Sequence, residues 1–256
     1  MKAVSIAFAT VLCVSLTAHA DDARAAQLLD GWITSDPLGF NSAEVVARIT
    51  LSDKTGSKRQ LAFSSKAKRY DPPYAKSIVR FSAPADLAGA AFLQVQNRSG
   101  DDDRFLFLPE LKRSRRIAGG LRTGAFMGTD LTYADLDQRD FRQAKASYRG
   151  EETIAKWVCD VIDVVPSEAS QYSHVEVWIR KDNGMPMRFR MYDKQKALLK
   201  TFEALEFKRV SGRWFVSKSR VTNEQLKHST ELQLEQITLA TDVADDAFTV
   251  RALEKS

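Results

Sequence analysis

Apolar and polar side chains alternate along this chain with a period of two from residue 44 onward. Ala47, Ile49 and Leu51 fall on one side of the first such run, and Arg48 and Thr50 fall on the other. This period is typical of a β-strand with one buried and one solvated face. Short links join the alternating runs, which favours antiparallel neighbours over a parallel sheet. We therefore predict a mainly β fold with a few helices and about ten or eleven strands.

The last of these runs contains a change of phase. Leu232 and Leu234 are in phase with each other, and so are Ile237 and Leu239, but the two pairs fall on opposite sides of a regular strand. One extra residue between them would bring all four to the same side, so we predict a β-bulge near Glu235.

Two further segments indicate how strands connect. Asn183 and Gly184 accept the positive φ angles of a tight turn, so they predict a hairpin between the runs on either side. Phe105–Leu108 is apolar on both faces, so we expect this strand to be covered on both sides. Residues 112–117 are its expected partner strand.

One helix is predicted near the start of the chain. Ala25, Leu28, Leu29 and Trp32 recur at three- and four-residue spacing, which places them in one apolar stripe. We expect an amphipathic helix over residues 22–33, ended by the Pro- and Gly-containing stretch that follows it.

The extreme N-terminus has the three parts of a secretory signal peptide. Lys2 supplies a positive charge, residues 3–17 carry no charge and are mostly apolar, and small residues follow up to Ala20. The alternative is a membrane anchor, but the apolar stretch has about 15 residues and a spanning helix needs about 20. We expect a signal peptide over residues 1–20, cleavage after Ala20, export, and one domain over residues 21–256.

Motifs of familiar catalytic and metal sites are missing from the sequence. It contains no G-x-S-x-G, Walker, H-E-x-x-H or C-x-x-C motif. After the expected cleavage, the chain keeps two histidines, His174 and His228, and one cysteine, Cys159, which excludes an internal disulfide. We predict that the protein is not an enzyme and has no cofactor or metal; a hydrolase with an unfamiliar site is one alternative.

The charge pattern also limits the partners. The formal net charge is +5, but basic residues alternate with acidic ones through most of the chain. We therefore expect no nucleic-acid partner and a modest attraction to anionic lipid head groups. The acidic triplet Asp101–Asp103 lacks the spacing of a calcium loop, so we interpret it as a solvated hairpin tip.

The segment 105–136, FLFLPELKRSRRIAGGLRTGAFMGTDLTYADL, is the most distinctive part of the chain. A doubly apolar strand ends at Pro109, five cations follow, and a glycine-rich loop then carries Phe126 and Met127. Apolar residues on a glycine-hinged loop beside cations suit an amphiphile with an anionic head and an apolar tail. The alternative is a structural loop that plugs one end of the sheet, with Phe126 and Met127 as core residues.

This segment resembles the LolA-like family of outer membrane lipoprotein-sorting proteins of Gram-negative bacteria. The close match covers Phe105 to Leu136, where the run from Phe126 fits F-M-G-[ST]-D-x-[ST]-Y-x-D-L, and the rest of the mature chain fits more loosely. The resemblance implies one strongly curved antiparallel sheet, an unclosed half β-barrel with helices over its concave apolar face. It also implies periplasmic residence, transfer of lipid or acyl groups between membranes, and an RND- or MMPL-type exporter as partner.

Two sets of residues are candidates for this function. The residues expected to line an apolar lipid site are Phe81, Phe92, Leu93, Phe105, Phe107, Phe126, Met127, Phe189, Met191 and Phe207. The cations expected to contact a head group or a membrane surface are Lys112, Arg113, Arg115, Arg116 and Arg122. The face assigned to each strand residue depends on register, because a shift of one residue reverses it. The second reading of the chain is an exporter accessory subunit with a filled core and no cargo.

Overall fold

A computed structural model describes residues 13–34, 42–71, 74–136, 139–239 and 242–255 of the chain. Within these ranges, thirteen strands form one antiparallel sheet that does not close into a barrel. The first six strands run from the middle of the sheet to one edge: β1 (Ser42–Ser52), β2 (Lys58–Asp71), β3 (Tyr74–Ala83), β4 (Ala91–Val95), β5 (Asp103–Leu108) and β6 (Arg113–Arg116). The other seven run from the opposite edge back to the middle: β7 (Lys145–Ile154), β8 (Trp157–Val165), β9 (His174–Arg180), β10 (Pro186–Tyr192), β11 (Leu198–Val210), β12 (Arg213–Asn223) and β13 (His228–Leu239).

The mainly β, unclosed fold is confirmed, and the sheet has more strands than the ten or eleven expected. Strand β7 was missed because Lys145–Ile154 contains few apolar residues, and six of its ten residues are exposed. The long β-prone run that begins at Ile154 is also interrupted at once. Ala155 has φ +53° in the turn between β7 and β8, so Ile154 ends one strand and Trp157 starts the next.

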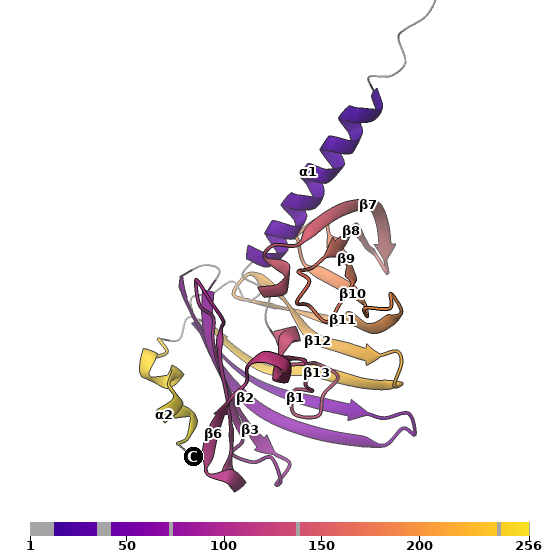
Figure 1. Ribbon diagram of the computed structural model, residues 1–256. Coiled ribbons are helices and arrows are strands. Elements are labelled where there is room, and N and C mark those ends of the chain that lie inside the picture. The colour runs from indigo at the N-terminus through magenta and orange to yellow at the C-terminus, as the bar shows by residue number, and fades with distance from the viewer. Residues whose placement is uncertain (1–12, 35–41, 72–73, 137–138, 240–241, 256) are drawn as a thin grey trace, which may run out of the picture.

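The chain must cross the whole molecule once to form this sheet. β6 and β7 are consecutive in sequence and lie at opposite edges, while β1 and β13 pair in the middle. Residues 117–136 and 139–144, called the crossing segment below, connect the two edges. They contain the short 3-10 helices η2 (Gly119–Thr123), η3 (Ala134–Leu136) and η4 (Arg139–Phe141). Figure 1 shows the sheet curving around this segment, which therefore lies on the concave face.

Helix α1 (Cys13–Thr34) covers the concave face at the β7–β9 end of the sheet. Ala25, Leu29 and Ile33 are buried there, which confirms the predicted helix over residues 22–33. Residues 1–12 of the expected signal peptide lie outside the described residues, and α1 passes through the expected cleavage point. No helix in the described part of the chain is long and apolar enough to cross a membrane.

The C-terminal segment covers the opposite, convex face. It contains η5 (Asp245–Phe248) and α2 (Val250–Leu253), and it buries Phe248 and Leu253 against Ile78, Leu93 and Phe107 of β3–β5. Figure 1 shows α2 outside the curve of the sheet. Helices therefore cover both faces, whereas the resemblance implied cover on the concave face alone. The strand β5 is covered on both sides, as its doubly apolar sequence predicted.

Two local predictions are confirmed in the register. Along the β1–β13 ladder, Val46 is opposite Gln236 and Ala47 is opposite Leu234, so Glu235 is the extra residue of a bulge. The turn with Asn183 and Gly184 joins β9 to β10, where Gly184 has φ +71°.

Candidate functional site

An aromatic cluster covers the concave face at the β1–β6 end of the sheet. Phe81 of β3 and Phe92 of β4 are 1% and 2% exposed, and Phe126 and Tyr133 of the crossing segment pack on them. The Phe126 ring centroid lies 5.3 Å from that of Phe92, 6.1 Å from that of Phe81 and 5.6 Å from that of Tyr133. Phe126 thus occupies the centre of an apolar site whose floor is the sheet.

A tight turn points Phe126 at the sheet. The Phe126 carbonyl accepts the amide of Thr129 at 2.9 Å, and the Phe126 amide donates to the Leu131 carbonyl at 2.7 Å. Between them, Met127 has φ +50° and Gly128 has φ +79°. Positive φ angles at two consecutive residues are typical of a type I′ turn. Glycine adopts this conformation easily, whereas most other residues are strained in it. A loop, rather than a helix or strand, therefore carries Phe126, which we call the plug of the aromatic cluster.

A network of polar side chains fastens the crossing segment to β11 and to the loop between β8 and β9. The Asp135 carboxylate accepts from Lys200 Nζ at 2.7 Å, the Tyr172 hydroxyl at 2.6 Å, Gln171 Nε2 at 3.0 Å and the Thr132 amide at 2.8 Å. The side chains of Asp135 and Lys200 are only 8% and 5% exposed. We call Asp135, Lys200, Tyr172 and Gln171 the polar latch.

The burial of this latch has energetic consequences. Removing two charges from water costs several kcal/mol per ion, and only good geometry with further hydrogen bonds offsets that cost. Asp135 has the four donors it needs. Burial, followed by the nearby Asp135 carboxylate, raises the pKa of Tyr172 well above its usual range, so the phenol stays a donor. A second polar contact lies nearby, since the Thr230 hydroxyl donates to Asp130 at 2.7 Å.

A second apolar cluster lies at the other end of the concave face, under α1. Its sheet side chains are Ile162, Val164, Val175 and Val177, with Phe189 and Met191 at its border. Trp32 of α1 packs on Phe189 with a ring-centroid distance of 5.2 Å. Phe202 of β11 continues the row, 5.0 Å from Phe189. Phe189, Met191 and Phe202 are only half-buried, so apolar side chains stay accessible between the two covers.

Charged contacts from Arg24 support α1, including an ion pair with Glu151 of β7 at 3.7 Å. Arg24 forms an ion pair with Asp160 of β8, whose side chain is 6% exposed. The Tyr148 hydroxyl donates to the same carboxylate at 2.8 Å. Burial, together with that hydrogen bond and the Asp160 charge, raises the pKa of Tyr148 to about 12.

The structure separates the predicted lining residues into two groups. Phe81, Phe92, Phe126, Met127, Phe189 and Met191 contribute to the two concave clusters. Leu93, Phe105, Phe107 and Phe207 lie on the convex side instead, the first three under the C-terminal segment and Phe207 beside Trp178. The correction follows from strand geometry, because neighbours such as Phe92 and Leu93 must point to opposite faces.

The predicted cations also divide. Arg113, Arg115 and Arg116 are on the edge strand β6, and Lys112 ends the preceding 3-10 turn η1 (Pro109–Leu111) with φ +48°. Arg116 pairs with Asp103 at 2.7 Å on the surface. Arg122 is far less exposed and pairs with Asp140 at 3.3 Å within the crossing segment. These residues therefore form an exposed basic edge and one separate arginine, rather than one cluster.

Some polar residues of the concave face gave no signal in the sequence. Lys200 and Arg104 sit in alternating strands, where a cation normally indicates a solvated face, yet they are 4% and 1% exposed. Arg104 pairs with Asp102 at 3.1 Å, and Asp102 is 3% exposed. The interpretation of Asp101–Asp103 as a wholly solvated tip is therefore wrong for Asp102. Within the described residues, no group of His, Cys, Asp or Glu could hold a metal ion.

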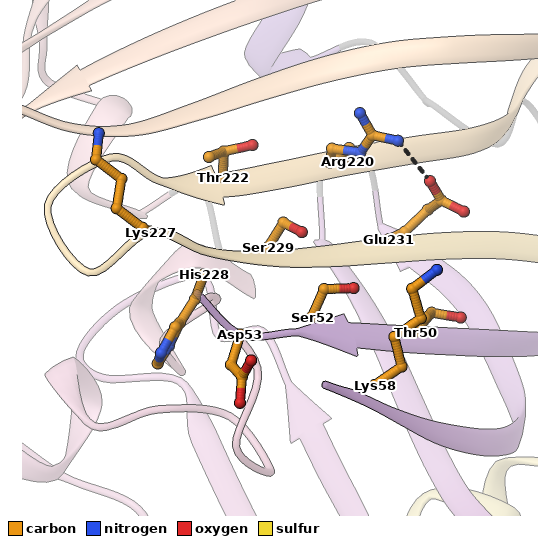
Figure 2. A pocket seen from close by; sticks show the side chains of 10 residues that line it. All are labelled: Thr50, Ser52, Asp53, Lys58, Arg220, Thr222, Lys227, His228, Ser229 and Glu231. Carbon is orange, nitrogen blue, oxygen red and sulfur yellow. Dashed lines mark hydrogen bonds and ion pairs between the residues drawn. The ribbon is translucent and has the colours of Figure 1, made fainter. Parts of the chain in front are cut away.

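The convex face carries a different kind of groove. A depression of about 370 Å³ lies over the ends of β1, β12 and β13 and the start of β2. Figure 2 shows that its walls are hydroxyls and charges, including Thr50, Ser229 and the ion pair between Arg220 and Glu231. Such a lining does not suit an acyl chain. The concave aromatic cluster is therefore the better candidate for an apolar ligand.

A comparison with protein-family models identifies the family of this chain. A model with the description "Uncharacterized protein" matches residues 74–255. The chain belongs to this family. The match begins at β3 and extends through α2, so the family model contains the crossing segment and the polar latch, while α1, β1 and β2 precede it.

Solved structures place this family member among LolA-like folds. An outer membrane lipoprotein-sorting domain from Vibrio parahaemolyticus, so described in its name, covers 91% of this chain and 100% of its own with 24% identity and a TM-score of 0.84. A DUF1329 family protein from Desulfovibrio piger covers 91% and 99% with 23% identity and a TM-score of 0.84. A LolA superfamily protein from Nitrosomonas europaea covers 88% and 97% with 19% identity and a TM-score of 0.67. The predicted LolA-like resemblance is thus confirmed as a fold. A search of curated proteins gives no match.

Proposed function

We propose that the protein is a periplasmic carrier that binds an acyl chain of a lipid or lipoprotein on the concave face, beneath the crossing segment. The fold is that of proteins named for lipoprotein sorting, which supports a carrier of lipid or lipoprotein as the general class. The apolar floor formed by Phe81 and Phe92, and the half-buried row of Phe189 and Phe202, support an acyl chain as the ligand.

The insertion of Phe126 into the aromatic cluster is the observation that carries this proposal. The ring is 6% exposed, yet it belongs to a loop that polar contacts fasten to the sheet. Burying a phenylalanine side chain contributes about 1.5–3 kcal/mol, and each buried methylene contributes about 0.8 kcal/mol. About two to four methylenes of an acyl chain could therefore replace Phe126 without a net loss of apolar burial. The crossing segment then acts as a lid over the acyl-chain site, and Phe126 fills the site when no acyl chain is bound.

Native mass spectrometry of protein purified from a Gram-negative periplasm tests the proposal. We expect adducts with the mass of a lipid or a fatty acid, and uptake of a fluorescent fatty acid by protein from which they have been removed. Arg220→Gln, on the convex face, is the matched control and should bind equally well. Protein that repeatedly carries no lipid and takes up no fatty acid would refute acyl-chain binding.

Localisation has its own test. Export and cleavage after Ala20 predict a mature N-terminus at Asp21, which N-terminal sequencing of the periplasmic protein would read directly. A mature chain that retains residues 1–20, or protein found only in the cytoplasm, would contradict the signal peptide. Crosslinking in the native host should also recover an RND- or MMPL-type exporter if the partnership implied by the resemblance applies.

The packing also supports a second candidate. Both apolar clusters of the concave face are covered by the protein's own residues, as a filled accessory subunit of an exporter would require. This candidate predicts a stable membrane-protein partner and no lipid adduct. The same mass spectra and crosslinks therefore decide between the two.

A further inference from the structure

A polar cleft of about 580 Å³ lies apart from both apolar clusters of the concave face. Three parts of the chain that are distant in sequence form its walls: the β4–β5 turn with the start of β3, the crossing segment around η4, and the loop between β8 and β9. The cleft therefore lies between the β3–β5 part of the sheet and the β8–β9 loop, where the crossing segment leads into β7. Its size is within the range of about 300–1,000 Å³ typical of small-molecule sites.

Arginine dominates the chemistry of this cleft. Arg98, Arg122 and Arg142 line it, together with the carboxylates Asp101 and Asp140. Arg122 pairs with Asp140 at 3.3 Å, and both side chains are largely buried, at 15% and 10% exposure. This ion pair neutralises the Asp140 carboxylate. Among the described lining residues the sum of charges is positive, because three arginines outnumber two aspartates.

Arg142 lines the same cleft and forms no ion pair with any described carboxylate. Its guanidinium carbon lies 4.8 Å from the centroid of the Tyr74 ring, a cation–π contact that holds the group at the cleft wall. Its Nε is buried and makes no hydrogen bond to any described residue. A buried donor without a partner costs about 1–3 kcal/mol, so this nitrogen calls for an acceptor that the protein itself does not supply.

We propose that this cleft is an anion site that takes a phosphate group through Arg142. The planar guanidinium presents paired donors that match two phosphate oxygens, and its cation–π contact with Tyr74 limits its motion before the anion binds. The hydroxyls of Ser99 and Ser167 line the same cleft and supply further donors. The chemistry is shared by a phosphorylated lipid head group and by a soluble phosphate. The site stands independently of acyl-chain binding on the concave face.

Isothermal titration calorimetry with inorganic phosphate at low salt tests the site. We expect saturable binding by the wild-type chain, at least a tenfold loss of affinity in Arg142→Gln, a smaller loss in Arg142→Lys, and no change in Arg220→Gln. Equal binding by the wild-type chain and Arg142→Gln, or no binding by the wild-type chain to phosphate or to a phosphorylated lipid, would overturn the proposal.

The source of the phosphate is decided by a second titration with dioctanoyl phosphatidic acid below its micelle concentration. Tighter binding than inorganic phosphate, with the gain lost in Phe81→Ala, assigns the cleft to a lipid head group. Equal affinities assign it to a soluble anion, and the cleft proposal holds in both cases. Phosphate binding without any acyl-chain binding would refute the carrier and leave the anion site intact.

A chemical measurement on the wild-type chain covers the case in which Arg142→Gln does not fold. Phenylglyoxal modifies accessible arginines, and mass spectrometry of the digested protein reports each site. Phosphate should protect Arg142 several-fold more than it protects the surface residue Arg220. Equal protection of the two arginines would overturn the assignment.

Discussion

Two covers lie on the same concave face, and they are held in different ways. Helix α1 buries a regular stripe, Ala25, Leu29 and Ile33, along several turns, and its Arg24 adds ion pairs with Asp160 and Glu151. The crossing segment has short 3-10 turns, buries Phe126 and Tyr133 in the aromatic cluster, and adds a buried polar latch at Asp135. Helix α1 is held by apolar contacts spread along its length, and the crossing segment is held by a few buried side chains.

In the proposed carrier, this difference assigns the moving part to the crossing segment. Apolar burial spread over a helix is lost gradually, since each residue contributes its own area. A buried ion pair changes sharply when one partner leaves, because the remaining charge is left in a low-dielectric site. The crossing segment is therefore the cover suited to a switch between closed and open states, and α1 is suited to a fixed wall.

The largest effect is expected at the aromatic cluster. Phe81→Ala should lower the free energy of unfolding by about 3–5 kcal/mol, because it leaves a cavity in the floor of the site. Phe126→Ala should cost less, since its loop can relax, and it should leave fatty-acid binding equal or tighter. Phe81→Ala should weaken that binding. Urea denaturation and fluorescent fatty-acid titration measure both quantities, and equal behaviour of the two variants would contradict the plug.

The polar latch should give the next largest effect. Lys200→Met leaves the Asp135 charge buried without its cation, which should cost about 3 kcal/mol. Hydrogen exchange should rise in residues 117–136 and stay unchanged in α1. The double variant Lys200→Met/Asp135→Leu should lose less than the sum of the two single variants, because the pair is removed together. Additive losses, or faster exchange in α1 as well, would show that the latch does not hold the lid.

The anchor of α1 should matter less. Arg24→Gln should lower the free energy of unfolding by about 1 kcal/mol, since Arg24 is partly exposed and Tyr148 still donates to Asp160. Fatty-acid binding should not change, because the floor under the crossing segment is untouched. Leu29→Ala is the matched apolar comparison and should cost more, about 2 kcal/mol or above. A larger loss from Arg24→Gln than from Leu29→Ala would reverse our assignment of α1 as an apolar cover.

The smallest effect should be seen only in alkaline solution. The raised pKa of Tyr172 means that the folded protein keeps the phenol proton at a pH where the unfolded chain has lost it. The contribution of Tyr172 to stability should therefore be constant below about pH 10 and fall as the pH rises further. Tyr172→Phe should reduce that slope without removing it, because burial also raises the pKa of Tyr133 and Tyr148. An unchanged slope in thermal unfolding between pH 9 and pH 11 would contradict the burial of this hydroxyl in the latch.

Local pattern was enough to predict most of the strands. The phase change at Glu235 predicted a bulge, and Asn183 with Gly184 predicted a hairpin, because both are decided by neighbouring residues. The pairing of β1 with β13 joins the first and last strands of the chain, so no local pattern contains it. The crossing segment follows from that pairing, since β6 and β7 are left at opposite edges.

The site was harder to predict than the fold. The faces of β4 and β5 could not be assigned, because Phe92, Leu93, Phe105 and Phe107 are apolar on both sides and each face is covered by a different segment. Buried Lys200 could not be recognised either. A lysine in an alternating strand indicates solvent unless its partner, here Asp135 from a distant segment, is already known.

Photocrosslinking tests the central claim most directly. Palmitic acid with a diazirine at its last carbon would be bound to the wild-type protein, irradiated, and the labelled peptides identified by mass spectrometry. The account predicts label on the concave side chains of β3 and β4, around Phe81 and Phe92, and on the turn that carries Phe126. Label confined to the convex face, around Leu93, Phe107 or the groove of Figure 2, would contradict an acyl-chain site beneath the crossing segment.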